Sequence, residues 1–559
     1  MSPFDHTKYR PFPVIRKPDR RWPSEQITRA PLWCAVDLRD GNQALIEPMN
    51  INQKQKMWAL LIKLGFKEIE IGFPSASQPD FDFCRWLIEE DQIPSDVKIQ
   101  ALTQARPELI ERTYEALEGA QQAIVHVYNS TSPVQREKVF KLDKQGIVSI
   151  ATKGAQKVLD ESRKYPSTRW YFEYSPESFS STEIDFSIEI CNAVIDVWQP
   201  TPEHKIILNL PATVECATPN VFADQIELFC DTIKHRDCVI ISLHTHNDRG
   251  CGVAAAELGL MAGADRIEGT LMGNGERTGN MDIVTLAMNL YSQGINPQLN
   301  LSNADEIVRT VSECTQITTH PRHPWFGELV FTAFSGSHQD AIRKCLAQQR
   351  HDEPWNVAYL PIDPKDLGRD YQSVIRVNSQ SGKGGVAYVL EQDYGLQLPR
   401  WLQIEASRKV QAHAEQESVE VAPEKIWEII ESAFMRSNDT RQLGNYRLTH
   451  NGKHEHIRAT LIDSDDHQTQ QVINGQGDGA LSAFCDAIEN HFGFHLEITH
   501  YHQHTLGTGT GASAMGYVQV KVGGQRYCGI AENKDVMSAN FNAILVCVEQ
   551  ALSAPQASH

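Results

Sequence analysis

The sequence has no run of about 18 uninterrupted apolar residues, the length that a membrane-spanning helix needs. Its beginning also lacks the short apolar segment and small-residue cleavage site of a signal peptide. These two absences predict a cytoplasmic protein without a membrane partner.

Paired cysteines and basic stripes are missing as well. The 12 cysteines are scattered over 559 residues without a C-x-x-C spacing, so we expect free thiols in a reducing compartment rather than a disulfide framework. The formal net charge of -19 would repel a phosphate backbone, and no sustained basic stripe offsets it. We therefore expect no nucleic-acid partner.

The chain is long, and β-rich and helix-like segments alternate regularly along much of it. Its 559 residues exceed the usual size of one hydrophobic core and predict two or three domains. From about residue 30, short β-rich runs alternate with helix-like stretches such as Asn52 to Leu64 and Pro219 to His235, which is typical of parallel βα units. The eight runs are Leu32 to Leu38, Glu68 to Pro74, Lys98 to Gln104, Gln122 to Asn129, Trp170 to Pro176, Lys205 to Ala212, Val239 to His246 and Arg266 to Met272. Eight units favour an α/β fold of the (β/α)8 TIM-barrel type, although a doubly wound sheet has a similar periodicity.

The regions outside these units have different compositions. The basic, proline-containing stretch from Lys8 to Arg21 is either an extended arm packed on the molecule or a partly ordered tail. After about Pro324 the alternation gives way to helical segments, and from about Asn445 β-like runs and helices indicate a small α+β domain. Its expected elements are Tyr446 to His450, Ala480 to His491, Ala514 to Val522 and Ala539 to Leu552. We predict an N-terminal arm (1–29), a catalytic barrel (30–325), a helical linker region (326–440) and a C-terminal domain (441–559).

Two segments at predicted strand ends carry the chemistry. Because alternate residues of a strand share a face, His244 and His246 should project together at the barrel mouth, where Asp40 can face them. Two imidazoles and a carboxylate with positions left open form a catalytic metal site. Asn280, after strand eight, is a further oxygen ligand or a neighbour that supports one. Taken alone, an H-x-H pair is weak evidence, and Arg39 beside Asp40 could be a surface ion pair.

These motifs resemble those of the Claisen-condensing acyltransferases, which include 2-isopropylmalate, homocitrate and citramalate synthases. The two signatures are LRDGNQ, followed after ten residues by Lys54, and the run HTHNDRG from His244 to Gly250. Asn42 stands where many members carry glutamate; with the arm and the SQSGKGG segment at Ser379 to Gly385, it resembles the longer subtype of 2-isopropylmalate synthases. NGQGDG at Asn474 to Gly479 and GTGTG at Gly507 to Gly511 resemble the family's leucine-responsive regulatory domain, with a dinucleotide-binding loop as the competing interpretation.

The resemblance implies an activity and a set of site residues. The expected reaction condenses acetyl-CoA with 2-oxoisovalerate, the first committed step of leucine biosynthesis, with a divalent cation polarising the keto group. That cation is Mg²⁺, with Mn²⁺ or Zn²⁺ as alternatives, and a monovalent cation such as K⁺ can assist. The metal ligands by this resemblance are Asp40, His244, His246 and Asn280. The catalytic residues are Arg39 for oxyanion charge and Glu177, His338 and Tyr371 for proton transfer, with the base unassigned.

The resemblance also implies substrate contacts and partners. The residues expected to bind the 2-oxo acid are His126, Ser175, Pro211 and Thr213, with Leu102 and Tyr128 shaping the pocket for the isopropyl group. His338 lies outside the barrel, in a region that covers the partner subunit's mouth in the family, so a homodimer is expected. Leucine is the expected effector of the C-terminal domain.

Four other functions compete with this one. Homocitrate and citramalate synthases share the motifs and differ in the acceptor. A metal-dependent TIM-barrel hydrolase also uses histidines at a barrel mouth. In the familiar hydrolases of this kind the H-x-H pair is on the first strand, whereas here it is on the seventh. A lyase of the same superfamily places a cysteine after strand eight, whereas no cysteine lies here between Cys251 and Cys314. An amino-acid sensor built on an inactive barrel is the fourth.

Overall fold

The structure of the protein is a computed structural model, and it describes residues 6–369, 371, 383–417, 421–435, 441–462, 470–506 and 512–554. The chain divides into two compact units. The first comprises residues 1–330 with 365–369, and the second comprises residues 331–364 with 370–559.

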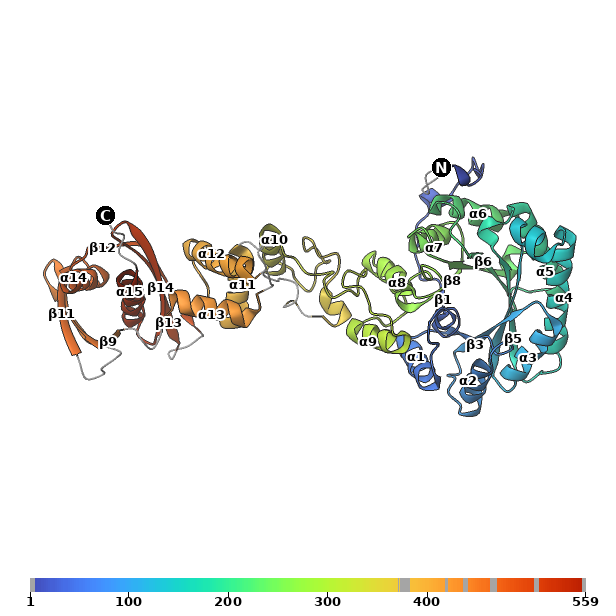
Figure 1. Ribbon diagram of the computed structural model, residues 1–559, viewed down its shortest axis with the longest axis horizontal. Coiled ribbons are helices and arrows are strands. Elements are labelled where there is room, and N and C mark those ends of the chain that lie inside the picture. Colours follow the sequence, from blue (N-terminus) through green and yellow to red (C-terminus); the bar gives the residue numbers. More distant parts are fainter. Residues whose placement is uncertain are drawn as a thin grey trace. The chain divides into compact units, whose positions relative to one another are not determined.

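The first unit is built on eight parallel strands that close into a barrel in the order β1 to β8 (Figure 1). The strands are β1 (Leu32–Ala35), β2 (Glu68–Gly72), β3 (Lys98–Gln104), β4 (Gln122–Ser130), β5 (Arg169–Glu177), β6 (Ile206–Ala212), β7 (Val239–Thr245) and β8 (Arg266–Gly269). Each lies within or within one residue of a run predicted from the sequence. The TIM barrel is thus confirmed, and the doubly wound sheet is wrong because β8 pairs with β1 and closes the sheet.

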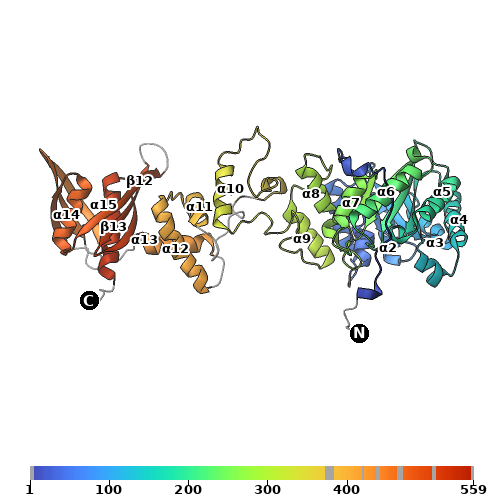
Figure 2. The same cartoon turned by 90° about the horizontal axis from the view of Figure 1, so that it is seen from above.

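Helices follow the strands and surround the barrel (Figures 1 and 2). They are α1 (Ile51–Leu64), α2 (Gln78–Glu89), α3 (Pro107–Leu117), α4 (Lys144–Ser162), α5 (Ile184–Trp198), α6 (Pro219–Thr232), α7 (Gly252–Met261), α8 (Ile283–Ser292) and α9 (Ala304–Thr315). Local signals set their ends: at α1 the Asn50 side chain accepts a hydrogen bond from the Gln53 amide, and Gly65 ends the helix at φ 98°. Met57, Trp58, Leu60, Leu61 and Leu64 form the buried apolar side of α1.

The first and last strands end earlier than their apolar runs suggest. The predicted strand to Leu38 stops at Ala35, and residues Asp37–Gly41 form a π-helical turn. Its position is fixed by the Asp37 carboxylate, which accepts a 2.9 Å hydrogen bond from the Leu271 amide beyond β8. The sequence suggested that Asp40 is at the end of the first strand. In the structure it lies in this turn instead.

The N-terminal arm packs on helix α6. The Lys17 ammonium lies 2.8 Å from Asp231, and Arg20 makes 2.6 Å contacts with both oxygens of Asp224. The Trp22 indole donates a 2.9 Å hydrogen bond to Asp224 as well. Of the two interpretations of the basic stretch, the structure thus supports the packed arm.

The second unit combines helices with two antiparallel sheets. Its helices are α10 (Gly336–Leu346), α11 (Lys383–Tyr394), α12 (Arg400–Glu417), α13 (Pro423–Phe434), α14 (Ala480–Phe492) and α15 (Val536–Ser553). Its strands are β9 (Gln442–Asn451), β10 (His454–Ile462), β11 (Gln470–Gly477), β12 (Leu496–Leu506), β13 (Ser513–Val522) and β14 (Gln525–Asn533). Helices α14 and α15 lie between the sheets β11-β10-β9 and β12-β13-β14 and share one apolar core with both (Figure 1). The α+β character expected for this region is confirmed.

The glycines at the end of β11 serve close packing. A Cβ atom at Gly475 would collide with the backbone of Ala483 and Ala487 in α14. Since β11 is antiparallel to β10, no βαβ unit surrounds these glycines, and the dinucleotide-loop interpretation of NGQGDG is wrong. The GTGTG run and residues 379–382 of SQSGKGG lie outside the described residues.

Helix α15 is long and apolar enough to cross a membrane by length and composition alone. In the structure its side chains from Ala539 to Val548 are buried between the two sheets. Its apolar character is that of a core helix.

Candidate metal centre and acceptor pocket

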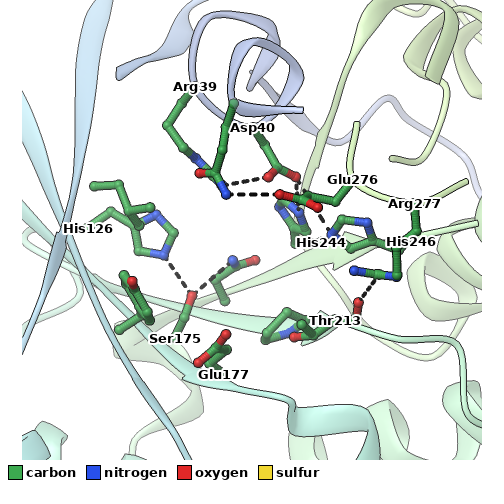
Figure 3. Close-up of a pocket in the computed structure, with 15 residues that line it drawn as sticks. Arg39, Asp40, His126, Ser175, Glu177, Thr213, His244, His246, Glu276 and Arg277 are labelled. Atoms are coloured by element: carbon green, nitrogen blue, oxygen red, sulfur yellow. Dashed lines mark hydrogen bonds and ion pairs between the residues drawn. The ribbon is translucent and has the colours of Figure 1, made fainter. Parts of the chain in front are cut away.

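A cluster of three metal-ligating side chains lies at the carboxyl end of the barrel (Figure 3). Ligand atoms of Asp40, His244 and His246 all lie within 4.8 Å of one another, and all three residues are buried. The Asp40 Oδ2 atom is 3.2 Å from His244 Nε2 and 3.6 Å from His246 Nε2. The two imidazoles come from β7 and the residue just after it, and the carboxylate comes from the turn after β1.

Asn280, in the loop after β8, lies beside His246 in the backbone pairing. It forms an isolated β-bridge with His246, and its amide nitrogen donates a 2.9 Å hydrogen bond to the Asn274 carbonyl. The Asn280 Oδ1 atom and the His246 Nδ1 atom are buried and have no hydrogen-bond partner among the described residues. Buried polar atoms normally find partners, so a donor set of two imidazoles, one carboxylate and an amide oxygen fits a divalent cation.

Electrostatics prepares the cluster for a cation. Burial opposes ionisation of Asp40, but the charge of Arg39 and a hydrogen bond from His244 hold its pKa well below the usual range. Burial and the neighbouring charge of His244 lower the pKa of His246 to about 4. Burial also disfavours the charged form of His244, yet hydrogen bonds to Asp40 and Glu268 raise its pKa to about 9. Asp40 is thus ionised and His246 neutral near pH 7, while a cation would have to displace a proton from His244.

The Arg39 guanidinium is fixed between two carboxylates at the mouth. It is ion-paired with Glu70 and lies 2.9 Å from the Asp40 Oδ1 atom. Because its side chain is only 10% exposed and its pKa is raised by both partners, it is a permanent cation in a site of low dielectric. The surface ion pair considered from the sequence is therefore wrong.

A cavity of about 270 Å³ opens beside the cluster. It is lined by every residue predicted to contact the acceptor, namely Leu102, His126, Tyr128, Ser175, Pro211 and Thr213. His126 Nε2 lies 2.7 Å from the Ser175 hydroxyl, on the side of the cavity opposite His246 (Figure 3). Leu102, Tyr128 and Pro211 add apolar surface to the lining of the same cavity. The arrangement suits a small molecule that is polar at one end and apolar at the other.

The residues predicted for proton transfer are divided between the two units. Glu177, the last residue of β5, lines the cavity and accepts a hydrogen bond from the Ser130 hydroxyl. His338 lies in α10 of the second unit and stacks on Tyr359, with ring centroids 4.1 Å apart. The Tyr371 hydroxyl in the same unit donates a 2.9 Å hydrogen bond to Asp363. The structure thus brings Glu177 together with Arg39 and the metal cluster, but it does not place His338 or Tyr371 at the cavity.

Sequence reasoning missed the side chains beneath the mouth. The fully buried polar groups in the barrel interior include Glu70, Gln100, Glu173, Arg266 and Glu268. Gln43 and Asn209 line the cavity without having been predicted, whereas Glu276 and Arg277 belong to the loop after β8 whose polar side chains were expected at the mouth. The available signal was the alternation in Glu68-Ile69-Glu70 and Arg266-Ile267-Glu268, which puts charged residues on one face of two short strands. Because the interior of a barrel is usually apolar, this alternation alone predicts strands and not a buried ion network.

Comparisons with known proteins agree with this geometry. Residues 30–311 match the HMGL-like family, which places the chain in that class of TIM-barrel proteins. Residues 328–391 match the alpha-isopropylmalate synthase post-catalytic domain-like family, and residues 420–552 match the LeuA allosteric (dimerisation) domain.

Two similar relatives cover nearly the whole chain. The 2-isopropylmalate synthase of Alcanivorax borkumensis is 56% identical over 545 residues, which are 98% of this chain and 97% of that protein. The 2-isopropylmalate synthase of Pseudomonas fluorescens is 54% identical over 552 residues, 99% of this chain and 98% of that protein. The chain belongs to the 2-isopropylmalate synthase family. Among solved structures, a hydroxymethylglutaryl-CoA lyase from Pseudomonas aeruginosa is 15% identical and superimposes with a TM-score of 0.42, over 51% of this chain and 93% of that one.

Proposed function

We propose that the protein condenses acetyl-CoA with 2-oxoisovalerate to give 2-isopropylmalate and CoA. The observation that carries this proposal is that the apolar groups of Leu102, Tyr128 and Pro211 line the same cavity as Asp40, His244 and His246. A 2-oxo acid with a branched apolar tail matches both sides of that cavity. The names of the similar relatives support the same reaction.

Asp40, His244, His246 and Asn280 would hold a divalent cation, for which Mg²⁺ is our first choice and Mn²⁺ or Zn²⁺ are alternatives. When bound, such an ion acts as a Lewis acid toward the keto and carboxylate oxygens of the acceptor. A requirement for a monovalent cation such as K⁺ stays a prediction.

The chain's own residues divide the remaining work. The Arg39 guanidinium would stabilise the negative charge that develops on the acceptor oxygen, because it is cationic and held rigidly by Glu70. Glu177 is our candidate for removing a methyl proton from acetyl-CoA, since its carboxylate faces the cavity and the Ser130 hydroxyl orients it. The carbon left by that proton attacks the keto carbon, and water then cleaves the thioester to release CoA. His338 and Tyr371 would assist these proton transfers from the linker region.

Contacts on the other side of the cavity would orient the acceptor. His126 and Ser175 present a hydrogen-bonded pair, and the Thr213 hydroxyl accepts a 3.0 Å hydrogen bond from the Ser178 amide. Leu102, Tyr128 and Pro211 would contact the isopropyl group. A pocket of this kind separates acceptors by about 1–3 kcal/mol per methylene, so it would favour 2-oxoisovalerate over pyruvate moderately.

The second unit suggests assembly and control. The match to an allosteric and dimerisation domain supports a homodimer, in which the linker region of one subunit would bring His338 to the mouth of the other. We assign feedback inhibition by leucine to the C-terminal domain predicted at residues 441–559. A cytoplasmic location stays a prediction from composition.

The test is steady-state release of free CoA from acetyl-CoA with 2-oxoisovalerate, pyruvate or 2-oxoglutarate, each with and without a chelator. We expect preference for 2-oxoisovalerate and loss of release on chelation. Preference for another acceptor would reassign the protein to a citramalate or homocitrate synthase reaction. Acceptor-independent release would indicate a hydrolase, and no release with any acceptor would refute the proposal and favour the sensor.

A further inference from the structure

The side chain of Gln100 occupies the centre of the barrel interior. It projects from β3, is fully buried, and its amide nitrogen donates hydrogen bonds to Glu70 at 2.7 Å and to Glu268 at 3.0 Å. Its amide oxygen accepts a 2.7 Å hydrogen bond from Arg266. The amide orientation is fixed by these neighbours, because the flipped form would set its oxygen against two carboxylates and its nitrogen against a guanidinium.

Each of the two glutamates extends the connection to an imidazole at the mouth. Glu70 lies 2.7 Å from His126 Nδ1, and Glu268 lies 2.9 Å from His244 Nδ1. The Glu70 carboxylate is ion-paired with Arg39, and the Glu268 carboxylate lies 2.9 Å from the Arg266 guanidinium, so each acid has a cation beside it. Both carboxylates thus act as hydrogen-bond acceptors, and Nδ1 of each imidazole is the donor toward its glutamate.

This arrangement determines what the imidazoles present to the cavity. Nε2 of His244 points at Asp40, within the metal cluster, and Nε2 of His126 points at the Ser175 hydroxyl in the acceptor pocket. A carboxylate that holds the distal nitrogen of a metal-binding histidine fixes its tautomer and ring orientation. Here two such carboxylates depend on the same amide.

We propose that Gln100 is a positioning residue that aligns the metal-binding imidazole and the acceptor-binding imidazole together, through Glu268 and Glu70. The part that concerns the acceptor rests on the proposed function. Among the 20 side chains, only an amide can donate to two acids and accept from an arginine at this point. A carboxylate would add a third negative charge, and an apolar residue would leave three buried charged groups each short of a partner.

The experiment compares Gln100→Met with Ser242→Ala. Methionine keeps the length and volume of glutamine but removes the hydrogen bonds to Glu70, Glu268 and Arg266. Ser242 is equally buried and accepts a 2.8 Å hydrogen bond from Arg266, but no hydrogen bond connects it to Glu70 or to the two imidazoles. Both variants disturb the Arg266 environment, whereas only Gln100→Met releases the two glutamates.

Two constants are measured on the full-length protein. The first is the dissociation constant of Mn²⁺, added alone to metal-free protein and followed by electron paramagnetic resonance. The second is the KM for 2-oxoisovalerate at saturating acetyl-CoA and Mn²⁺, with the KM for acetyl-CoA as an internal reference. For Gln100→Met we expect both constants to rise by about 10–100-fold, the usual effect of losing a partner of a metal-binding histidine. For Ser242→Ala we expect both to stay within twofold of the wild type.

A fall in thermal stability with both constants unchanged would overturn the proposal and leave Gln100 a structural residue. A change in only one constant would overturn the shared alignment. If Gln100→Met does not fold, Glu268→Gln, which keeps the shape of the network, should weaken Mn²⁺ binding at least tenfold while the KM for 2-oxoisovalerate changes less; unchanged Mn²⁺ affinity in that variant would also refute the idea. Mn²⁺ binding is measured without substrate, so its result stands even if the wild-type protein releases no CoA.

Discussion

The interior of the barrel and the core of the C-terminal sheets bury different kinds of side chain. The barrel interior holds Glu70, Glu173, Arg266 and Glu268 at 0–1% exposure, connected by hydrogen bonds and ion pairs. The core of the C-terminal sheets holds apolar groups such as Phe484, Val518, Phe541 and Ile544, equally buried. Buried ion networks add little net stability compared with apolar packing, but their geometry is strict. The buried groups of the barrel interior therefore serve mainly to position side chains at the mouth, whereas the apolar core of the C-terminal domain serves mainly to stabilise the fold.

The strongest test of this contrast is a conservative change at the mouth. Asp40→Asn keeps the shape of the side chain but removes its charge, and we expect kcat to fall about 1000-fold, since losing about 4 kcal/mol of Lewis-acid stabilisation corresponds to that factor. Bound metal, measured by elemental analysis, should fall with it. Asp231→Asn, in α6 where it binds the arm and outside the cavity lining, is the control and should retain activity. Turnover of Asp40→Asn within tenfold of the wild type would contradict the assignment.

The opposite test removes volume from the C-terminal core. Phe541 is fully buried and stacks on Phe484 with ring centroids 4.4 Å apart. Phe541→Ala should lower the free energy of unfolding of this unit by about 3–5 kcal/mol, through lost burial and the cavity left behind. Calorimetry should show one unfolding transition shifted, with Mn²⁺ affinity unchanged. A parallel loss of Mn²⁺ affinity would show that the units are not independent.

Ligands should separate the two regions without any mutation. Mn²⁺ at 100 times its dissociation constant should stabilise the barrel by about 2.7 kcal/mol, because it binds only the folded state. Leucine at a comparable excess should stabilise the C-terminal transition in the same way. Thermal scans with each ligand alone check both expectations. A shift of the barrel transition by leucine alone would place the leucine site elsewhere.

The smallest expected effect concerns the choice of acceptor. Leu102 lines the cavity at 7% exposure, and Leu102→Ala should make room for a longer side chain. We compare kcat/KM for 2-oxoisovalerate with kcat/KM for a 2-oxo acid that is one methylene longer. The free energy by which the enzyme prefers 2-oxoisovalerate should fall by about 1–3 kcal/mol. Leu243→Ala is the matched control, because this side chain faces helix α7 and should change stability only. An unchanged ratio in Leu102→Ala would exclude it from the pocket.

The sequence predicted the structure correctly where the spacing of residues along a strand or helix agreed with a recognisable motif. The eight strands follow from alternating β-rich and helical segments, and His244 and His246 follow from the two-residue repeat of a strand. Asp40 was assigned correctly to the mouth but to the wrong element, because the hydrogen bond that turns the chain there comes from Leu271, more than 200 residues away. Long-range contacts of this kind leave no local pattern.

The interior network was beyond reach for a related reason. Gln100 lies in a strand of ordinary composition, and nothing near it in the sequence indicates that its partners come from β2 and β8. The pairing becomes visible only when the barrel closes and brings those strands to opposite sides of one amide. His338 and Tyr371 were predicted from the family resemblance, and they stay predictions.

Helix α15 bears on how the chain reaches its folded state during synthesis. Every element that it contacts, including α14, β9, β13 and β14, precedes it in the chain. Those surfaces have therefore already been translated when this very apolar helix leaves the ribosome. Its exposure to water, and to other unfinished chains, would be limited to the time that one helix needs to dock. The order of elements along the chain thus limits how long this helix stays undocked.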